Sequence, residues 1–122
     1  MANVLLMDAD RVLCRYVKSI LVDAGHNVSL AFDGVDGIAT FKCRHFDVVI
    51  VELFMPEKEG IETIRELKQL DREVPIIAVT AGTYSCCPFH YLRVAKKLGA
   101  QETLRKPFDP GELQSLVAAC LN

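Results

Sequence analysis

Short apolar runs that alternate with helix-like segments constrain the fold of this chain more than any other feature. The runs cover residues 4–7, 28–31, 48–51 and 76–79, with a weaker one around residues 103–104. Because they are continuous rather than alternating, they suit strands that are buried on both faces of a parallel sheet. Five strand–helix units in succession predict an α/β fold with a doubly wound parallel sheet and right-handed crossovers.

The segments between the runs carry apolar residues at helical spacing. The predicted stripes are Leu13, Val17, Ile20, Leu21 and Ala24 in the first segment, Val35, Ile38 and Ala39 in the second, and Ile61, Ile64 and Leu67 in the third. Gly25 and Gly99 stand where helices would end through a left-handed residue. The last helix has a clear start signal, with Asp109 as the N-cap and Pro110 as the first helical residue.

Composition limits the classes of function. A chain of 122 residues, of which 51% are hydrophobic, predicts a single domain over residues 1–122. A net charge of -2 and a pI near 5.9 indicate no general attraction to nucleic acid or to an anionic membrane. No apolar run is long enough to span a bilayer, and no signal peptide opens the chain. We therefore expect a cytoplasmic protein.

The cysteines are five in number and show no C-x-x-C spacing and no histidine at metal-ligand spacing. Their expected role is that of small buried hydrophobic residues. The adjacent Cys86 and Cys87 could instead form a vicinal disulfide or a redox-sensitive pair, although disulfides are rare in a reducing compartment. The five are Cys14, Cys43, Cys86, Cys87 and Cys120.

Polar residues follow four of the five apolar runs. Asp8 follows the first, Glu52 the third, Thr80 the fourth and Lys106 the fifth. The carboxyl ends of parallel strands form the ligand-binding edge of such sheets, so these side chains should converge. Two carboxylates could hold a hard cation, and the hydroxyl and ammonium could bind phosphoryl oxygens. Each residue alone could simply begin a loop, but the four together favour a phosphoryl site.

These residues and their neighbours resemble the signature of response-regulator receiver domains, over nearly the whole chain. The matching segments are Asp8, then Glu52-Leu53-Phe54-Met55-Pro56 with Gly60, Thr80-Ala81, and Lys106-Pro107-Phe108. The resemblance implies a flavodoxin-like fold with strand order 2-1-3-4-5 and a cis bond before Pro107. It also implies an aspartyl phosphate exchanged with a histidine kinase, and Mg²⁺ held by Asp8, Glu52 and the backbone carbonyl of Phe54.

The first departure from the family pattern concerns the metal. Receivers usually carry two adjacent acids after the first strand, whereas Asp8 is followed here by Ala9. The next acid, Asp10, is better explained as the N-cap of the following helix. Magnesium prefers near-octahedral oxygen ligands, so the loss of one acid predicts that Mg²⁺ binding is weak or absent.

The second departure is Glu52 itself, which stands where the family has Asp as its phosphoacceptor. One added methylene displaces the carboxylate in a site where phosphoryl transfer depends on positioning, so phosphorylation of Glu52 is not expected. Two readings remain open. Glu52 could partly mimic a phosphoryl group by pairing with Lys106 or Thr80, or it could merely neutralise Lys106 in a disused site.

The third departure is Thr103, at a position where receivers usually carry an aromatic switch residue. A threonine has no ring to move between inward and outward positions, so that part of the switch is altered or missing. Thr80, which corresponds to the family's switch hydroxyl, is retained.

The resemblance implies a signalling partner, either a histidine kinase or an output domain. The expected docking surface runs from the helix that carries Arg93, Lys96 and Lys97 to the last helix, although these cations could also be a solvated face. A homodimer is a further option, and no direct nucleic-acid contact is expected.

Three functions are compatible with these features. The leading hypothesis is a non-enzymatic interaction module, either independent of phosphorylation or held in one state by Glu52. The second is a magnesium-dependent phosphoacceptor with residual activity. The third is a flavodoxin-type carrier, which the acids at positions 8 and 10 disfavour because they would repel a phosphate.

Overall fold

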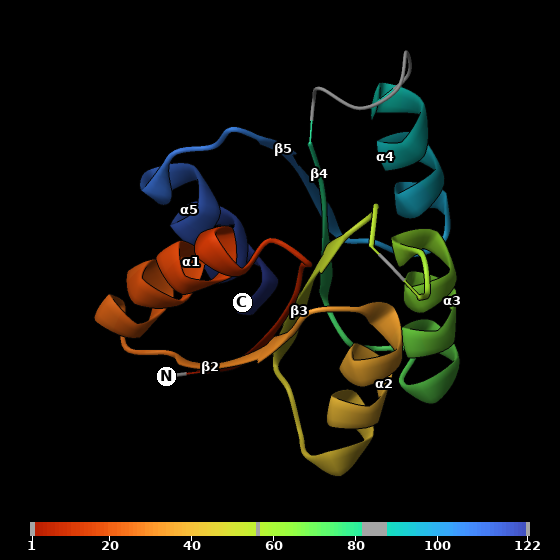
Figure 1. The fold of residues 1–122 in the computed structure, drawn as a ribbon, viewed down its shortest axis with the longest axis horizontal. Coiled ribbons are helices and arrows are strands. Elements are labelled where there is room, and N and C mark those ends of the chain that lie inside the picture. The colour runs from red at the N-terminus through yellow and green to blue at the C-terminus, as the bar shows by residue number, and fades with distance from the viewer. Residues whose placement is uncertain (1, 56, 82–87, 122) are drawn as a thin grey trace.

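The computed structural model describes residues 2–55, 57–81 and 88–121, and it contains a five-stranded parallel sheet enclosed by helices (Figure 1). The sheet order is β2-β1-β3-β4-β5, so the predicted doubly wound, flavodoxin-like architecture is confirmed. The elements are β1 (Asn3–Met7), α1 (Arg11–Asp23), β2 (Asn27–Ala31), α2 (Gly34–Cys43), β3 (Val48–Glu52), α3 (Gly60–Leu70), β4 (Ile76–Ala81), α4 (Pro88–Lys97), β5 (Glu102–Lys106) and α5 (Pro110–Leu121).

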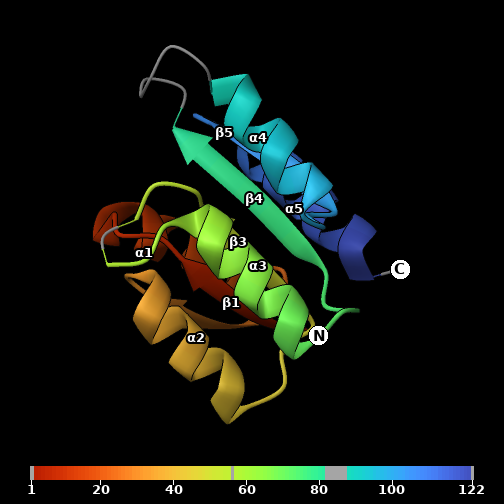
Figure 2. The ribbon, with the colours of Figure 1, turned by 90° about the vertical axis from the view of Figure 1, so that its right-hand side faces the viewer.

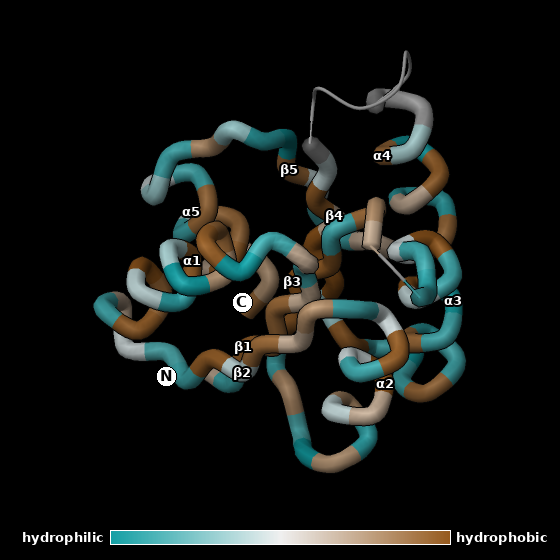
Figure 3. Tube along the Cα trace, viewed as in Figure 1, coloured by the Kyte–Doolittle hydropathy of each residue, from teal (hydrophilic) through white to brown (hydrophobic). Residues whose placement is uncertain are grey.

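The helices form two layers, one on each face of the sheet. Helices α1 and α5 cover one face, and α2, α3 and α4 cover the other (Figures 1 and 2). The central strand β3 is buried along its whole length, whereas most of the edge strand β2 is only partly buried. Figure 3 shows hydrophobic residues along the central strands and alternating hydrophobic and hydrophilic turns in the helices. This arrangement explains why the apolar runs are continuous in the strands and periodic in the helices.

The predicted helical stripes are confirmed for α3 and for most of α1, where Ala24 is the exposed C-cap, but not for α2. Val35 is 55% exposed and Ala39 is also exposed, while Ile38 is buried. The reason is that α2 packs closely through a glycine: a Cβ on Gly37 would lie 2.3 Å from the sulfur of Met7. The apolar periodicity was therefore misleading here, because the contact face of α2 contains residues without large side chains.

The predicted helix ends are also observed. Gly25 and Gly99 have φ values of 94° and 118°, and each follows a helix in the left-handed region. Asp109 caps α5 by accepting a 2.8 Å hydrogen bond from the backbone N–H of Glu112. The peptide bond between Lys106 and Pro107 is cis, as the family resemblance implied.

The cysteine prediction is partly wrong. Cys14 and Cys120 are buried, and burial raises the pKa of their thiols to about 12 and about 11. Cys43 is exposed at the end of α2, so it does not act as a buried hydrophobic residue. Cys86 and Cys87 lie outside the described residues. Within the described ranges, no helix is both long and apolar enough to cross a bilayer.

The start of α3 depends on a glycine that contacts the strand carrying Glu52. A Cβ on Gly60 would lie 2.4 Å from the carbonyl oxygen of Glu52 and from the Cα of Leu53. Both are backbone atoms, which cannot rotate away. We expect Gly60→Ala to lower the free energy of unfolding by about 1–3 kcal/mol, measured by urea denaturation.

The matched control is Gly111→Ala near the start of α5, where the added Cβ would meet only a carboxylate oxygen of Asp109, at 3.2 Å. That change should be neutral or slightly stabilising, because alanine is the better helix former. Equal losses in the two variants would contradict the proposed role of the close backbone approach at Gly60.

Candidate functional site

Four polar residues lie together at the carboxyl edge of the sheet. Asp8 follows β1, Glu52 ends β3, Thr80 lies near the end of β4, and Lys106 ends β5. The parallel register aligns these ends, since Glu52 pairs with Val79, the neighbour of Thr80. The side chains of this edge are enclosed: relative exposure is 4% for Asp8, 4% for Glu52 and 0% for Thr80. The site is therefore built by the sheet topology rather than by a local sequence motif.

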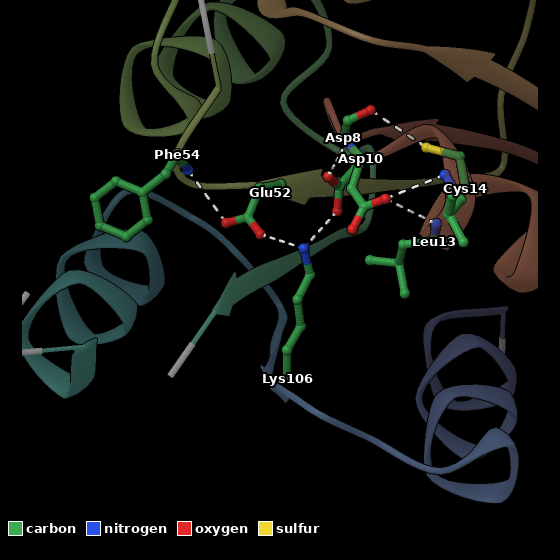
Figure 4. Close-up of polar contacts among 8 residues, drawn as sticks. Asp8, Asp10, Leu13, Cys14, Glu52, Phe54 and Lys106 are labelled. Carbon is green, nitrogen blue, oxygen red and sulfur yellow. Dashed lines mark hydrogen bonds and ion pairs between the residues drawn. The ribbon is translucent and has the colours of Figure 1, made fainter. Parts of the chain in front are cut away.

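Lys106 joins the two carboxylates (Figure 4). Its Nζ lies 2.8 Å from Oδ2 of Asp8 and 2.6 Å from Oε1 of Glu52. The Lys106 side chain is itself only 18% exposed. Charge-assisted hydrogen bonds of this length in a buried setting are stronger than neutral ones. One ammonium thus neutralises one of two buried carboxylates, and the three charges leave a net charge of about -1 at neutral pH.

The second oxygen of Glu52 is held by the backbone. Oε2 accepts a 3.2 Å hydrogen bond from the N–H of Phe54. Burial nevertheless raises the pKa of Glu52, and the negative charge of Asp8 adds to this, while Lys106 and the Phe54 N–H act in the opposite direction. The site therefore keeps the Glu52 carboxylate in a fixed position at some cost in desolvation.

Lys106 is stabilised in its charged form. Burial alone would lower its pKa, but the hydrogen bonds and charges of Asp8 and Glu52 outweigh burial, so the pKa is raised. An ammonium that contacts two carboxylates keeps its proton well above neutral pH. Lys106 therefore acts as a permanent counter-ion for the two acids.

Thr80 is close to this cluster in the sheet but does not join it. Its Oγ1 is buried and finds no hydrogen-bond partner among the described residues. Of the two contacts considered for Glu52, the structure contains the one with Lys106 and not the one with Thr80. An unpaired buried hydroxyl has a free-energy cost, and it remains able to bond to an oxygen placed in the site.

Asp10 is the N-cap of α1, in agreement with the preferred reading of the sequence. Its Oδ1 accepts hydrogen bonds of 3.1 Å from the backbone N–H groups of Val12 and Leu13. Its own N–H donates to Oδ1 of Asp8 at 2.9 Å. The Asp10 carboxylate is thus engaged with the helix, and Ala9 beside it is exposed and has no oxygen to offer.

The residues present do not fit a pre-formed magnesium site. All four carboxylate oxygens of Asp8 and Glu52 already have a protein partner. Within the described part of the chain, no group of three or more His, Cys, Asp or Glu side chains could hold a metal ion. The ammonium of Lys106 lies between the two acids, where it supplies the positive charge. The role of the Phe54 carbonyl as a ligand stays a prediction.

Thr103 lies away from the acid cluster. Residues alternate between the faces of a strand, and Leu104 belongs to the cluster under α1 and α5, so Thr103 faces the other layer. It lines a groove of about 450 Å³ that crosses the edge strand β5 between α4 and α5, with Leu92, Arg93, Lys96, Leu104, Arg105 and Glu112. Thr103 thus belongs to the surface beside α4 and β5 and carries no ring.

Two contacts of the site were not foreseen from the sequence. The ring of Phe54 packs edge-on against Tyr91 of α4, with ring centroids 5.0 Å apart. The thiol of Cys14 donates to the carbonyl oxygen of Asp8 at 3.2 Å. The aromatic pair connects the segment that holds Glu52 to helix α4. The spacing of aromatic residues could have suggested a contact, but not which rings would meet.

Comparison with known proteins identifies the family. Residues 4–118 match the model of the response regulator receiver domain. The transcriptional regulatory protein ZraR of Salmonella typhimurium is 33% identical over 98% of this chain and 26% of its own length. Response regulator ArlR of Staphylococcus aureus is 30% identical over 99% of this chain and 53% of its own length. The chain spans about half the length, or less, of these curated relatives.

Solved structures agree with the fold. A receiver domain protein from Clostridium thermocellum superposes with a TM-score of 0.92 at 27% identity, covering 100% of this chain and 95% of that one. The chemotaxis protein CheY4 of Vibrio cholerae superposes with a TM-score of 0.88 at 29% identity, covering 99% of both chains. The buried acids and lysine at the sheet edge, the strand order and these matches together show that the chain belongs to the response-regulator receiver family of two-component signalling.

Proposed function

We propose that this receiver domain acts as a protein-interaction module whose site is held in one state by Glu52 rather than switched by phosphorylation. The observation that carries the proposal is the position of Lys106, which contacts Asp8 and Glu52 at the same time. In this arrangement the cation that would stabilise an incoming phosphoryl group is already neutralised. The domain itself would have no catalytic activity and would work in the cytoplasm.

The chemistry of Glu52 supports this proposal. Both of its oxygens are engaged, one by Lys106 and the other by the Phe54 N–H. Attack on a phosphoryl group would require one oxygen to leave its partner and a second anion to enter a pocket that already carries a net negative charge. A phosphoryl group carries about -1.5 to -2 charges, whereas Glu52 carries one, so its fixed charge would be a partial substitute at most.

The proposed partner is a histidine kinase or an output domain that docks on the surface from Arg93 and Lys97 to α5. Both of these cations are exposed on α4, and the groove beside Thr103 borders this surface. The Phe54–Tyr91 contact provides a physical connection between Glu52 and α4. Two of the relatives are named as regulators and are longer than this chain, which fits an attached output domain. A homodimer through the same surface is an alternative, and neither mode requires nucleic acid or membrane.

The test is the intact mass of the protein after incubation with Mg²⁺ and acetyl phosphate. We expect no stoichiometric phosphoryl adduct, because Glu52 and Lys106 are paired. Peptide mapping would locate any adduct that forms. A stoichiometric adduct on Glu52 would overturn the proposal and favour a working phosphoacceptor.

A second candidate function is residual phosphotransfer in a phosphorelay, with an acid such as Glu52 or Asp8 as acceptor. The unpaired buried hydroxyl of Thr80 favours it, since this group would gain a partner from a phosphoryl oxygen. A flavodoxin-type carrier is less well supported. The N–H groups at the start of α1, which could bind a phosphate, are already bonded to the Asp10 carboxylate.

A further inference from the structure

We propose that a basic groove between α3 and the end of α4 is a docking site for an acidic segment of a partner protein. The basic groove has a volume of about 520 Å³ and is lined by Arg65, Lys68, Gln69, Arg72, Leu98 and Gly99. Helices that connect parallel strands run opposite to them, so the ends of α3 and α4 lie at the amino edge of the sheet (Figure 2). The groove is thus at the opposite edge from Glu52 and shares no residue with that site.

The cations that line the groove have no internal counter-ions. Arg65 and Arg72 are exposed, and neither side chain makes a hydrogen bond or ion pair within the described part of the chain. Arg65 and Gln69 lie four residues apart on one side of α3, and Arg72 follows just beyond the end of the helix, where it lines the same groove. Among the described residues, none that lines the groove is acidic. This side presents hydrogen-bond donors and two complete positive charges to solvent.

The floor of the groove is fixed by Lys68. Its Nζ donates to the carbonyl oxygen of Val74 at 2.7 Å and lies 3.4 Å from that of Arg72. Its aliphatic stem lies over Gly99, where an added Cβ would be 2.9 Å from Cε. Lys68 therefore adds a third positive charge in a defined position. Gly99 lacks a side chain that would fill the space, so the groove stays open beside the two arginines.

The dimensions and charge favour a short carboxylate-bearing segment. From Arg65 to the end of α3 at Leu70 the helix rises about 7–8 Å, and Arg72 lies two residues beyond, so the groove suits two or three successive anionic groups. Guanidinium groups bind carboxylates through paired hydrogen bonds, and Leu98 adds an apolar contact beside them. The whole chain has a net charge of -2, which would repel a long polyanion such as DNA or an anionic bilayer. A short acidic protein segment can pair with the cations of the groove and is small enough to avoid repulsion by the rest of the chain, so we take it as the occupant.

The test uses the full chain and a fluorescent peptide of alternating Glu and Gly, with a Gln–Gly peptide as the uncharged probe. Binding is followed by fluorescence anisotropy at low and high salt. We expect the Glu peptide to bind the wild type, to weaken as salt rises, and to bind R65E/R72E at least tenfold less tightly. The Gln–Gly peptide should not bind. Amide NMR shifts on peptide addition should centre on residues 65–72 and 98–99.

The matched control is R15E/K42E, which makes the same change in net charge at exposed positions of α1 and α2. It should bind the Glu peptide within about threefold of the wild type, and circular dichroism should show both variants folded. Equal losses in the two variants would reduce the effect to net charge and overturn the proposal. The proposal would also be overturned if the Glu peptide did not bind, or if the NMR shifts centred on other residues. Tighter binding of the wild type to a DNA oligonucleotide or to phosphatidylserine vesicles than to the Glu peptide would overturn it as well.

Discussion

Replacement of Lys106 by Met should lower the free energy of unfolding by about 3–5 kcal/mol at neutral pH. The ammonium bonds to Asp8 at 2.8 Å and to Glu52 at 2.6 Å, and both carboxylates are 4% exposed. Methionine keeps much of the length of lysine and removes the charge. The variant would hold two buried acids side by side without a counter-ion, which is costly. Urea denaturation at pH 7.5 measures the loss.

The pH dependence of this loss follows from the signs of the pKa changes. Burial already raises the pKa of Glu52, and removal of Lys106 would raise it further. An acid whose folded pKa exceeds its unfolded pKa loses stability as pH rises through that range and regains it on acidification. The difference between the variant and the wild type should therefore shrink as pH falls from neutral toward the ordinary pKa of glutamic acid, about 4.3. In the wild type, Lys106 has a raised pKa, so its contribution persists until pH exceeds the ordinary lysine range.

Two control variants distinguish the effect of losing the buried charge on stability from the effect of replacing a lysine side chain. Lys97→Met removes an exposed lysine from α4 and should change stability by less than about 0.5 kcal/mol. The double variant K106M/E52Q keeps only one buried acid and should recover part of the loss. If Lys106→Met were no less stable than Lys97→Met, the bridge between Asp8 and Glu52 would have no structural role.

The double variant A9D/E52D should accept a phosphoryl group at least about 100-fold faster than the wild type. The reason is geometric: shortening Glu52 withdraws its carboxylate by one methylene, and a displacement of about 1 Å can change such rates by about this factor. Ala9 is exposed next to Asp8, so an aspartate there can add oxygen ligands for Mg²⁺ without entering the core. Lys106 and Thr80 stay in place to bind phosphoryl oxygens.

Intact mass after timed incubation with Mg²⁺ and acetyl phosphate measures this gain, and peptide mapping should place the adduct on residue 52. The single variants A9D and E52D are the controls, and each should gain less than the pair, because nucleophile and metal binding act together. A wild type that reacts as fast as A9D/E52D would show that neither Ala9 nor Glu52 limits the chemistry.

The sequence was a good guide wherever burial alone decides the structure. Residues 48–51 are continuous and apolar because β3 is buried on both faces, and this pattern requires no knowledge of contacts. The prediction was wrong at Val35, because α2 packs through Gly37 against Met7 rather than through its apolar residues. A periodic pattern of large apolar side chains does not reveal a helix such as α2, whose backbone packs directly against a strand through glycine.

The site illustrates a second limit. Strand ends placed Asp8, Glu52, Thr80 and Lys106 at one edge, and Asp10 was correctly assigned to the helix cap. The choice between Lys106 and Thr80 as the partner of Glu52 could not be made from spacing. It depends on how far the Lys106 side chain extends from β5 past β4 to Glu52 on β3. It also depends on how Asp8 and Glu52 share that one ammonium. The Phe54–Tyr91 contact likewise depends on ring orientation, which only the folded packing determines.

The bridge made by Lys106 also has a consequence for synthesis of the chain. Lys106 and Asp8 are 98 positions apart, so their ion pair connects the first strand to the last. A chain emerging from the ribosome presents both acids before the lysine that neutralises them has been made. Sheet assembly up to β4 would therefore proceed with the acid pair uncompensated, and addition of β5 would supply the missing charge. This edge of the sheet therefore reaches its final electrostatic state only after β5 has been made.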